Sequence, residues 1–153
     1  MDRQFKRLVY EYEKFINERL PACSEAIGHP VETSCTILDL DGVKISKFYD
    51  VKEYVKTAAS IGQDRYPECM GKFLIVNAPW SFNLAFSIIK PWLDEVTAKK
   101  IQNIHQKDLI KHIDEENLPE FLGGKCKCLE GCSMSDAGPW NPKDGEGKDT
   151  ETS

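Results

Sequence analysis

The sequence predicts an α/β fold organised as a single domain. Helical and strand patterns alternate along the chain in the order helix, strand, helix, strand, helix. The second strand pattern, residues 72–77, is a nearly continuous apolar run, as expected for a parallel strand buried on both faces. The length of 153 residues suits one domain.

The first expected helix covers residues 3–20. Its apolar side chains recur at spacings of three and four, and charged residues fill the opposite face. We expect Pro21 to end this helix and residues 22–32 to form a loop. Residues 33–40 then predict a strand, on which Ser34 and Thr36 share one face because side chains alternate along a strand.

The middle of the chain predicts a second helix and the buried strand. Residues 50–62 carry an apolar stripe made of Val51, Tyr54, Val55, Ala58 and Ile61. A third, short strand is at most weakly indicated at residues 43–47. A sheet of so few strands is not a comfortable independent unit, so the sequence looks like the second half of a larger α/β domain.

Residues 82–93 predict a helix that is apolar on almost every side. Its polar residues Asn83, Ser87 and Lys90 are spaced by four and three, so they form one narrow stripe. A helix of this kind is buried or contacts lipid. At about 12 residues it is too short to span a bilayer.

The remaining sequence predicts short helices and a tail. We expect helical turns at residues 94–101 and 106–113, and a last helix from Asp114 that ends at Gly123 and Gly124. From residue 133 onward Gly, Pro, Asp, Glu and Thr dominate. The expected organisation is therefore a domain over residues 1–132 and a flexible acidic tail over residues 133–153.

Charge and targeting signals narrow the class of protein. The net charge is −5, and residues 133–153 carry three of the excess negative charges. A nearly neutral body lacks the basic footprint of a nucleic-acid-binding protein. The N-terminus lacks the apolar region of a signal peptide. We therefore expect a cytoplasmic protein whose cysteines are reduced and which does not bind nucleic acid.

The sequence does not predict an enzyme. The glycine-rich, nucleophile-elbow and zinc-protease motifs are absent from it, so no catalytic residue is assigned. Thr97 and Lys100 share a helix face, and Glu68 lies in a loop. These are ordinary surface residues, or a lysine and a carboxylate that meet over a phosphate or an inositol ring. Composition alone leaves both interpretations open.

Three cysteines are clustered near the end of the expected domain. Cys126, Cys128 and Cys132 are spaced C-x-C-x3-C. Without a fourth neighbouring ligand the pattern is a weak zinc signal, and a reduced surface loop is the alternative. No metal ligand is assigned.

Several motifs together resemble a known family. In order and spacing they are similar to the C-terminal half of the CRAL-TRIO lipid-binding domain, in particular that of fungal Sec-fourteen-like phosphatidylinositol/phosphatidylcholine transfer proteins. The motifs are RLPAC (19–23), VETSCTILDLDG (31–42), YPECMGKF (66–73), IVNAP (75–79), KPWLD (90–94), ENLP (116–119) with Gly123 and Gly124, and SDAGPW (135–140).

The resemblance implies a mixed sheet flanked by helices, and a lipid cavity closed by a mobile helical gate. It implies exchange of one phospholipid for another between membranes, with no covalent chemistry, no cofactor and transient contact with Golgi membranes. Three sets of residues match family positions: Ser34 and Thr36 for phosphatidylcholine; Glu68, Thr97 and Lys100 for phosphatidylinositol; and Phe82, Phe86, Ile89 and Trp92 for the gate and acyl chains.

The sequence also departs from the family. The N-terminal helical module and the first half of the lipid-binding domain are missing, and residues 102–107 are about three residues shorter than expected, which would disturb the position of Lys100. The alternative function is therefore a truncated fragment that binds a membrane or a partner without transfer. The missing half would then be supplied by another chain.

Overall fold

The computed structural model describes residues 2–128 and 131–141. The chain forms two compact units, each built from two stretches of sequence. Unit 1 contains the chain up to Tyr12 together with Glu32–His105, and unit 2 contains Glu13–Val31 together with the chain from Gln106 onward. In the described ranges, no helix is both long and apolar enough to cross a membrane.

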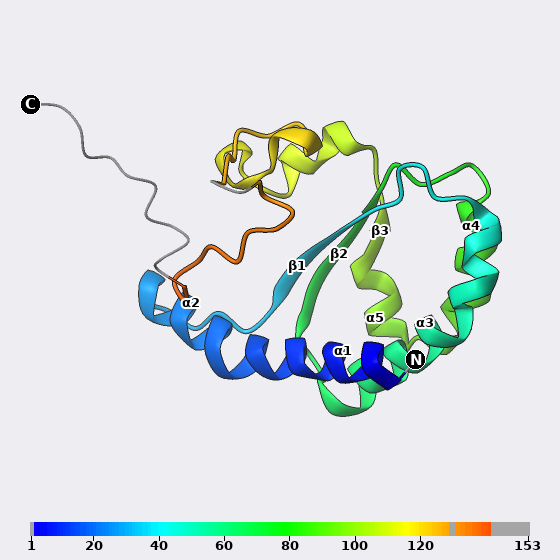
Figure 1. Cartoon of the computed structure of the whole chain (residues 1–153), viewed down its shortest axis with the longest axis horizontal. Coiled ribbons are helices and arrows are strands. Elements are labelled where there is room, and N and C mark those ends of the chain that lie inside the picture. Colours follow the sequence, from blue (N-terminus) through cyan, green and yellow to red (C-terminus); the bar gives the residue numbers. More distant parts are fainter. Residues whose placement is uncertain (1, 129–130, 142–153) are drawn as a thin grey trace, which may run out of the picture. The chain divides into compact units, whose positions relative to one another are not determined.

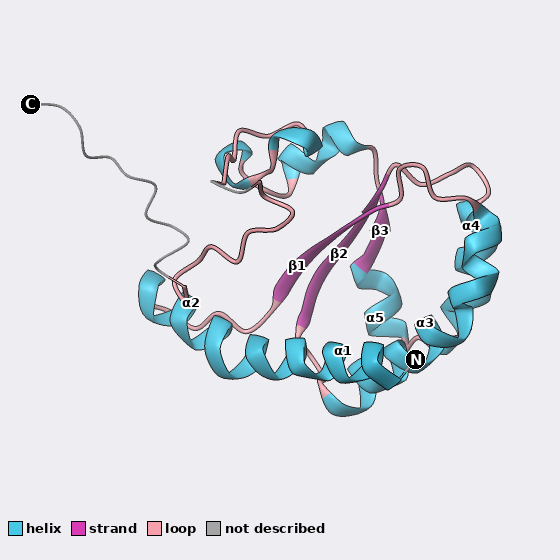
Figure 2. Ribbon diagram, viewed as in Figure 1, coloured by secondary structure: helices cyan, strands magenta, loops and turns pink. Residues whose placement is uncertain are grey.

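Unit 1 is built on a three-stranded sheet. The strands β1 (Ser34–Asp39), β2 (Met70–Val76) and β3 (Ile101–Asn103) lie in the order β1-β2-β3, and both strand pairs are parallel (Figure 2). The α/β class is thereby confirmed. The resemblance implied a mixed sheet, whereas both pairs that the structure describes are parallel.

The central strand supplies the core of unit 1. Leu74 and Val76 are fully buried and Ile75 is nearly so, which confirms burial of the apolar run. By contrast β1 pairs on one side only in the described sheet, and Leu38 on it is 40% exposed. The sheet therefore has a buried central strand, and β1 is one of its two edge strands.

The predicted strand at residues 43–47 is wrong. Ile45 is the first residue of α3 (Ile45–Arg65), which extends beyond the predicted helix at both ends. The third strand is instead β3, which is too short to show an alternating pattern and exists because Ile101 pairs with Phe73 of β2. Tertiary pairing, rather than local propensity, determines the position of the third strand.

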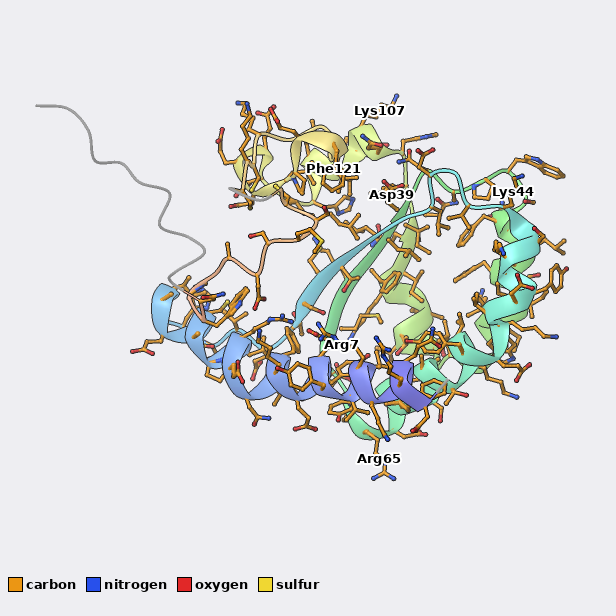
Figure 3. The ribbon with its side chains drawn as sticks, viewed as in Figure 1. Arg7, Asp39, Lys44, Arg65, Lys107 and Phe121 are labelled. Atoms are coloured by element: carbon orange, nitrogen blue, oxygen red, sulfur yellow. The ribbon has the colours of Figure 1, made fainter. Side chains whose placement is uncertain are left out.

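The helices of unit 1 follow the strands. They are the first part of α1 (Asp2–Lys14), then α3, α4 (Phe82–Ile89) with a 3-10 turn over Lys90–Trp92, and α5 (Glu95–Lys100). Helices α3 and α4 pack against each other (Figure 1). The residues of the predicted apolar stripe all lie on α3, where they are half-buried except for Val51, which is 45% exposed. At the end of α3, Arg65 points outward (Figure 3).

Aromatic stacking attaches α1 to α3 within unit 1. The ring centroids of Phe5 and Tyr54 are 5.1 Å apart, and those of Tyr12 and Tyr66 are 4.4 Å apart. Burial raises the pKa of Tyr12, because its ionised form would lose solvation there. These stacked pairs explain the part of the apolar stripe that Phe5 and Tyr12 form on the first helix.

Pro21 does not end the first helix as predicted. A π-helical turn over Phe15–Arg19 leads directly into α2 (Leu20–Ile27), and Pro21 lies in the first turn of α2. Proline is tolerated there because its missing N–H would have no partner within the new helix. The helix ends at Gly28, whose φ of 76° suits a left-handed cap, so the expected loop begins only there.

Unit 2 has its own small core. Leu109, Leu118 and Leu122 are buried, and they lie on or beside the 3-10 helices Gln106–Lys111, Glu115–Asn117 and Glu120–Leu122. The short helices predicted here are therefore present as 3-10 rather than α-helical turns. Gly123, with a φ of 94°, ends the last of them.

The predicted tail falls partly outside the described residues. Residues 142–153 are not described, but residues 133–141 are. Within the latter, Asp136 pairs with Lys14 at 2.5 Å and with Arg19 at 2.9 Å, and its Oδ1 accepts a hydrogen bond from Trp140 Nε1. The boundary at residue 133 remains a prediction, although Asp136 makes specific contacts beyond it.

Candidate functional site

Most of the residues predicted to bind headgroups lie at the N-terminal ends of the strands in unit 1. Ser34 and Thr36 begin β1, Glu68 precedes β2, and Lys100 immediately precedes β3. Because the three strands are parallel, these positions are all at the strands' amino ends. The fold thus brings together residues that are up to 66 positions apart in the sequence.

Glu68 and Lys100 are in direct contact. Lys100 Nζ lies 3.3 Å from Glu68 Oε2, and the two side chains are 24% and 83% exposed. Glu68 has a φ of 62°, an uncommon left-handed conformation for a glutamate. The ion pair is long and its carboxylate faces solvent, so the pair itself contributes little stability. The ammonium group is available to an anionic ligand such as a phosphate.

Thr97 lies one helical turn before Lys100, but its polar groups are engaged locally. Its N–H donates to Asp94 Oδ1 at 2.9 Å, which caps the start of α5. The Thr97 hydroxyl also hydrogen-bonds this carboxylate, and these bonds hold the pKa of Asp94 below its usual value. The structure therefore brings Glu68 and Lys100 together, while Thr97 serves as a helix-capping partner of Asp94.

A strand follows Lys100, in the segment that the resemblance predicts to be shortened. Lys100 is the last residue of α5, and β3 follows at once, with Ile101 opposite Phe73. Ile104 then donates its N–H to the carbonyl of Ile75 at 2.9 Å. This pairing keeps Lys100 at the sheet edge and within reach of Glu68.

The two hydroxyls of β1 are half-buried. Ser34 Oγ donates to the carbonyl of Cys69 at 3.2 Å, across to the residue that precedes β2. A headgroup that binds Ser34 would exchange this bond for one with the ligand. The same two strands are joined there by the bond from Ser34 N–H to the Cys69 carbonyl at 2.9 Å, so the backbone position does not depend on the hydroxyl.

The predicted gate residues lie on α4 and the turn after it. Phe82 is buried and its ring stacks on that of Phe86, with centroids 5.8 Å apart, while Phe86, Ile89 and Trp92 are half-buried. Leu84 on the same helix is 59% exposed. The segment is thus apolar toward both the protein and the solvent.

Gln63 makes two hydrogen bonds that the sequence analysis did not predict. From α3, its Nε2 donates to the carbonyl of Trp92 at 3.1 Å, and its Oε1 accepts the N–H of Asp94 at 2.6 Å. The amide thereby joins α3 to the chain between α4 and α5. In the sequence, this linking role of Gln63 is indicated only by its position as a polar residue beside the apolar stripe of the helix.

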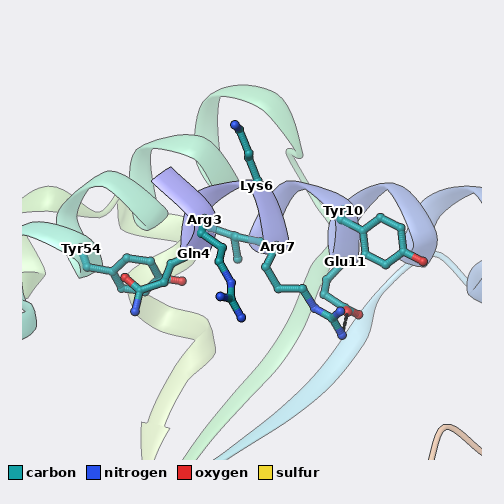
Figure 4. Close-up of a pocket in the computed structure, with 8 residues that line it drawn as sticks. Arg3, Gln4, Lys6, Arg7, Tyr10, Glu11 and Tyr54 are labelled. Atoms are coloured by element: carbon teal, nitrogen blue, oxygen red, sulfur yellow. Dashed lines mark ion pairs between the residues drawn. The ribbon is translucent and has the colours of Figure 1, made fainter. Parts of the chain in front are cut away.

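One pocket in unit 1 lies away from these residues. It is lined by α1 and by Tyr54 of α3, and its cationic side chains include Arg3 and Arg7, the latter paired with Glu11 (Figure 4). None of the predicted site residues lines it. The N-terminal ends of the three strands, rather than this pocket, remain the candidate functional site.

The geometry defines an α/β domain with polar side chains at the amino edge of a parallel sheet and an apolar helix packed on α3. The family profile described as the CRAL/TRIO domain matches residues 1–124. The chain belongs to this family, which confirms the resemblance found in its motifs.

Individual relatives agree with this assignment. The chain is 50% identical to the Sec14 cytosolic factor of Schizosaccharomyces pombe, over 92% of this chain and 50% of that protein. It is 49% identical to the SEC14 cytosolic factor of Kluyveromyces lactis, over 98% and 52%. The phosphatidylinositol/phosphatidylcholine transfer protein SFH12 of Arabidopsis thaliana is 39% identical over 94% of this chain and 28% of its own length.

A solved structure shares the fold. The crystal structure of Sfh5 matches with a TM-score of 0.50 and 28% identity, over 54% of this chain and 30% of that chain. The chain spans about half the length of the fungal relatives named above.

Proposed function

We propose that the chain binds one phospholipid, phosphatidylinositol or phosphatidylcholine, and exchanges it between membranes through a CRAL-TRIO-type cavity. The contact between Lys100 and Glu68 at the amino edge of the sheet carries this proposal, because a shielded ammonium beside an exposed carboxylate suits a phosphoinositol headgroup. The names of the relatives, which include a phosphatidylinositol/phosphatidylcholine transfer protein, support it.

The proposed roles divide the site in three. Glu68, Thr97 and Lys100 bind phosphatidylinositol, and Ser34 and Thr36 bind phosphocholine. The apolar residues of the α4 segment contact the acyl chains and act as the gate; they are Phe82, Phe86, Ile89 and Trp92. The exchange involves no covalent step and no cofactor. The protein acts in the cytoplasm and touches Golgi membranes peripherally.

Native mass spectrometry after incubation with mixed phosphatidylinositol and phosphatidylcholine vesicles tests the proposal. We expect one phospholipid per chain, and a loss of phosphatidylinositol of about tenfold or more in Lys100→Ala, since a hydrogen bond to a charged group is worth about 1.5–3 kcal/mol. Glu68→Lys should have the same direction of effect.

Lys99→Ala provides the matched control. Lys99 lies on the same helix, pairs with Glu95 at 2.6 Å and has a side chain that is 73% exposed. Its removal changes the charge equally but leaves the Glu68 pair intact. Retention of phosphatidylinositol by both Lys100→Ala and Glu68→Lys would contradict the headgroup assignment.

A second function is favoured by the open edge of the sheet. In the described structure β1 pairs only with β2, and Leu38 on it is 40% exposed. The chain would then bind a membrane or a partner that supplies further strands, without transferring lipid. Vesicle binding with no one-to-one lipid adduct in the mass spectrum would identify this alternative.

A further inference from the structure

The three clustered cysteines of unit 2 form a group with the spacing of metal ligands. Cys126 Sγ lies 3.9 Å from Cys128 Sγ and 3.8 Å from Cys132 Sγ. All three sulfurs lie within 4.8 Å of one another, and all three residues are half-buried. The C-x-C-x3-C pattern left a zinc site and a reduced surface loop open. In the structure its three thiols lie together in one compact group.

These separations match a known coordination geometry. A tetrahedral zinc ion with Zn–S bonds of about 2.3 Å places its sulfur ligands about 3.8 Å apart. The sulfur positions therefore need little rearrangement to accept an ion between them. Soft thiolate ligands favour zinc and copper(I) over magnesium or calcium.

The backbone around the cluster holds it in place. Cys126 donates its N–H to the carbonyl of buried Leu118 at 2.9 Å and forms an isolated bridge with Pro119. Cys132 donates its thiol to the carbonyl of Cys126 at 3.2 Å. The main-chain contacts of Cys126 would persist once the thiols bind a metal, whereas the Cys132 thiol would give up its hydrogen bond on becoming a thiolate ligand.

We propose that Cys126, Cys128 and Cys132 bind one zinc ion through three thiolates, with the fourth position taken by solvent or by an incoming ligand. The ion would join the Pro119–Cys126 bridge to the chain that continues to Asp136, and so would stabilise unit 2. The proposed lipid site lies in unit 1, so this inference stands or falls independently of the proposed function.

Zinc binding by the whole chain tests the proposal. The protein, reduced with a phosphine and stripped with a chelator, is dialysed against zinc chloride and its bound metal is measured by mass spectrometry. We expect one zinc per chain, and its loss in the triple variant Cys126→Ser, Cys128→Ser, Cys132→Ser. The matched control replaces the other three cysteines, Cys23, Cys35 and Cys69, by serine and should keep the metal.

Alkylation of the unaltered chain provides a readout that does not depend on how the variants fold. Zinc should slow the modification of Cys126, Cys128 and Cys132 by iodoacetamide about tenfold or more, and leave exposed Cys35 unchanged. Absence of bound zinc in the reduced chain overturns the proposal. So does equal binding by the two triple variants, or equal protection of all six cysteines.

Discussion

At the scale of single residues, Asp136 shows how one carboxylate organises unit 2. Its hydrogen bond from Lys14, helped by Arg19 and Trp140, lowers its pKa to about 2. Arg19 also lies over the Trp140 ring, 5.6 Å from its centroid. The SDAGPW motif, which the sequence offered only as a point of resemblance, therefore has a structural role as an anchor.

The lowered pKa predicts a pH-dependent stability. Because the folded pKa lies below the value of about 3.9 in an unfolded chain, the carboxylate stabilises the fold above pH 4, and this contribution is lost as the pH falls toward 2. Asp136→Asn should lower the free energy of unfolding by about 1–2 kcal/mol at pH 7 and by almost nothing near pH 2.

Urea unfolding at both pH values measures this difference. Glu25→Gln is the control, since Glu25 is an exposed acid on α2 in the same unit. An equal loss of stability at pH 7 and pH 2 would show that the aspartate acts through packing instead of charge.

A second prediction at the residue scale compares the loss of stability when Gly28 or Gly124 is replaced by alanine. A methyl group on Gly124 would collide with the backbone carbonyl of Leu118, whereas one on Gly28 would meet open space and only strain a φ of 76°. Gly28→Ala should therefore cost about 1–2 kcal/mol. Gly124→Ala should cost more than about 3 kcal/mol, because neither backbone segment can move freely. Thermal unfolding ranks the two, and a larger loss in Gly28→Ala would contradict the close approach.

At the scale of elements, α4 is the segment whose surface and sequence agree best with a membrane role. Phe82 and Ala85 are buried toward the protein, and Leu84 faces out with 59% exposure. Exposed apolar side chains on a short helix partition into the bilayer interface. A charge placed there should therefore weaken membrane contact without disturbing the fold.

Leu84→Asp tests this expectation. We expect binding to phosphatidylinositol-containing vesicles to fall about tenfold or more, since a charge in the bilayer costs about 2.5–3.5 kcal/mol. Asn83→Asp adds the same charge at the neighbouring exposed residue and should have a much smaller effect. Vesicle sedimentation provides the measurement, and equal losses in the two variants would show that charge alone is responsible.

The elements also show what the sequence could and could not predict. The strand over residues 72–77 and the apolar helix from residue 82 could be predicted from the sequence, because each pattern continues for several residues. The three-residue β3 could not, since it depends on pairing with β2, and the start of α3 at Ile45 was also missed. The contact between Glu68 and Lys100 spans 32 positions, so the residues alone left it open and only the resemblance paired them.

At the scale of the whole molecule, the chain beyond residue 133 should support α2 and the turn before it. Asp136 contacts Lys14, which precedes the π-helical turn leading into α2, and Arg19, which is the last residue of that turn. A chain ending at Ser133 should lose amide-exchange protection over residues 15–27, by about tenfold or more if one charged hydrogen bond of about 1.5–3 kcal/mol is lost.

A chain ending at Asn141 is the matched control for this truncation, because it keeps Asp136 and Trp140. Its exchange pattern should equal that of the 153-residue chain. Equal protection in both shortened chains would indicate that residues 133–141 belong to the flexible tail that the composition predicts.

The interleaving of the two units has a consequence for how this protein can be divided. The chain crosses from one unit to the other between residues 12 and 13, 31 and 32, and 105 and 106. A contiguous piece covering residues 32–105 would contain the strands β1, β2 and β3 of the described sheet but would lack Tyr12, whose ring stacks on that of Tyr66. Neither unit corresponds to a single uninterrupted stretch of the chain. Cutting the chain at one point therefore cannot release either unit whole.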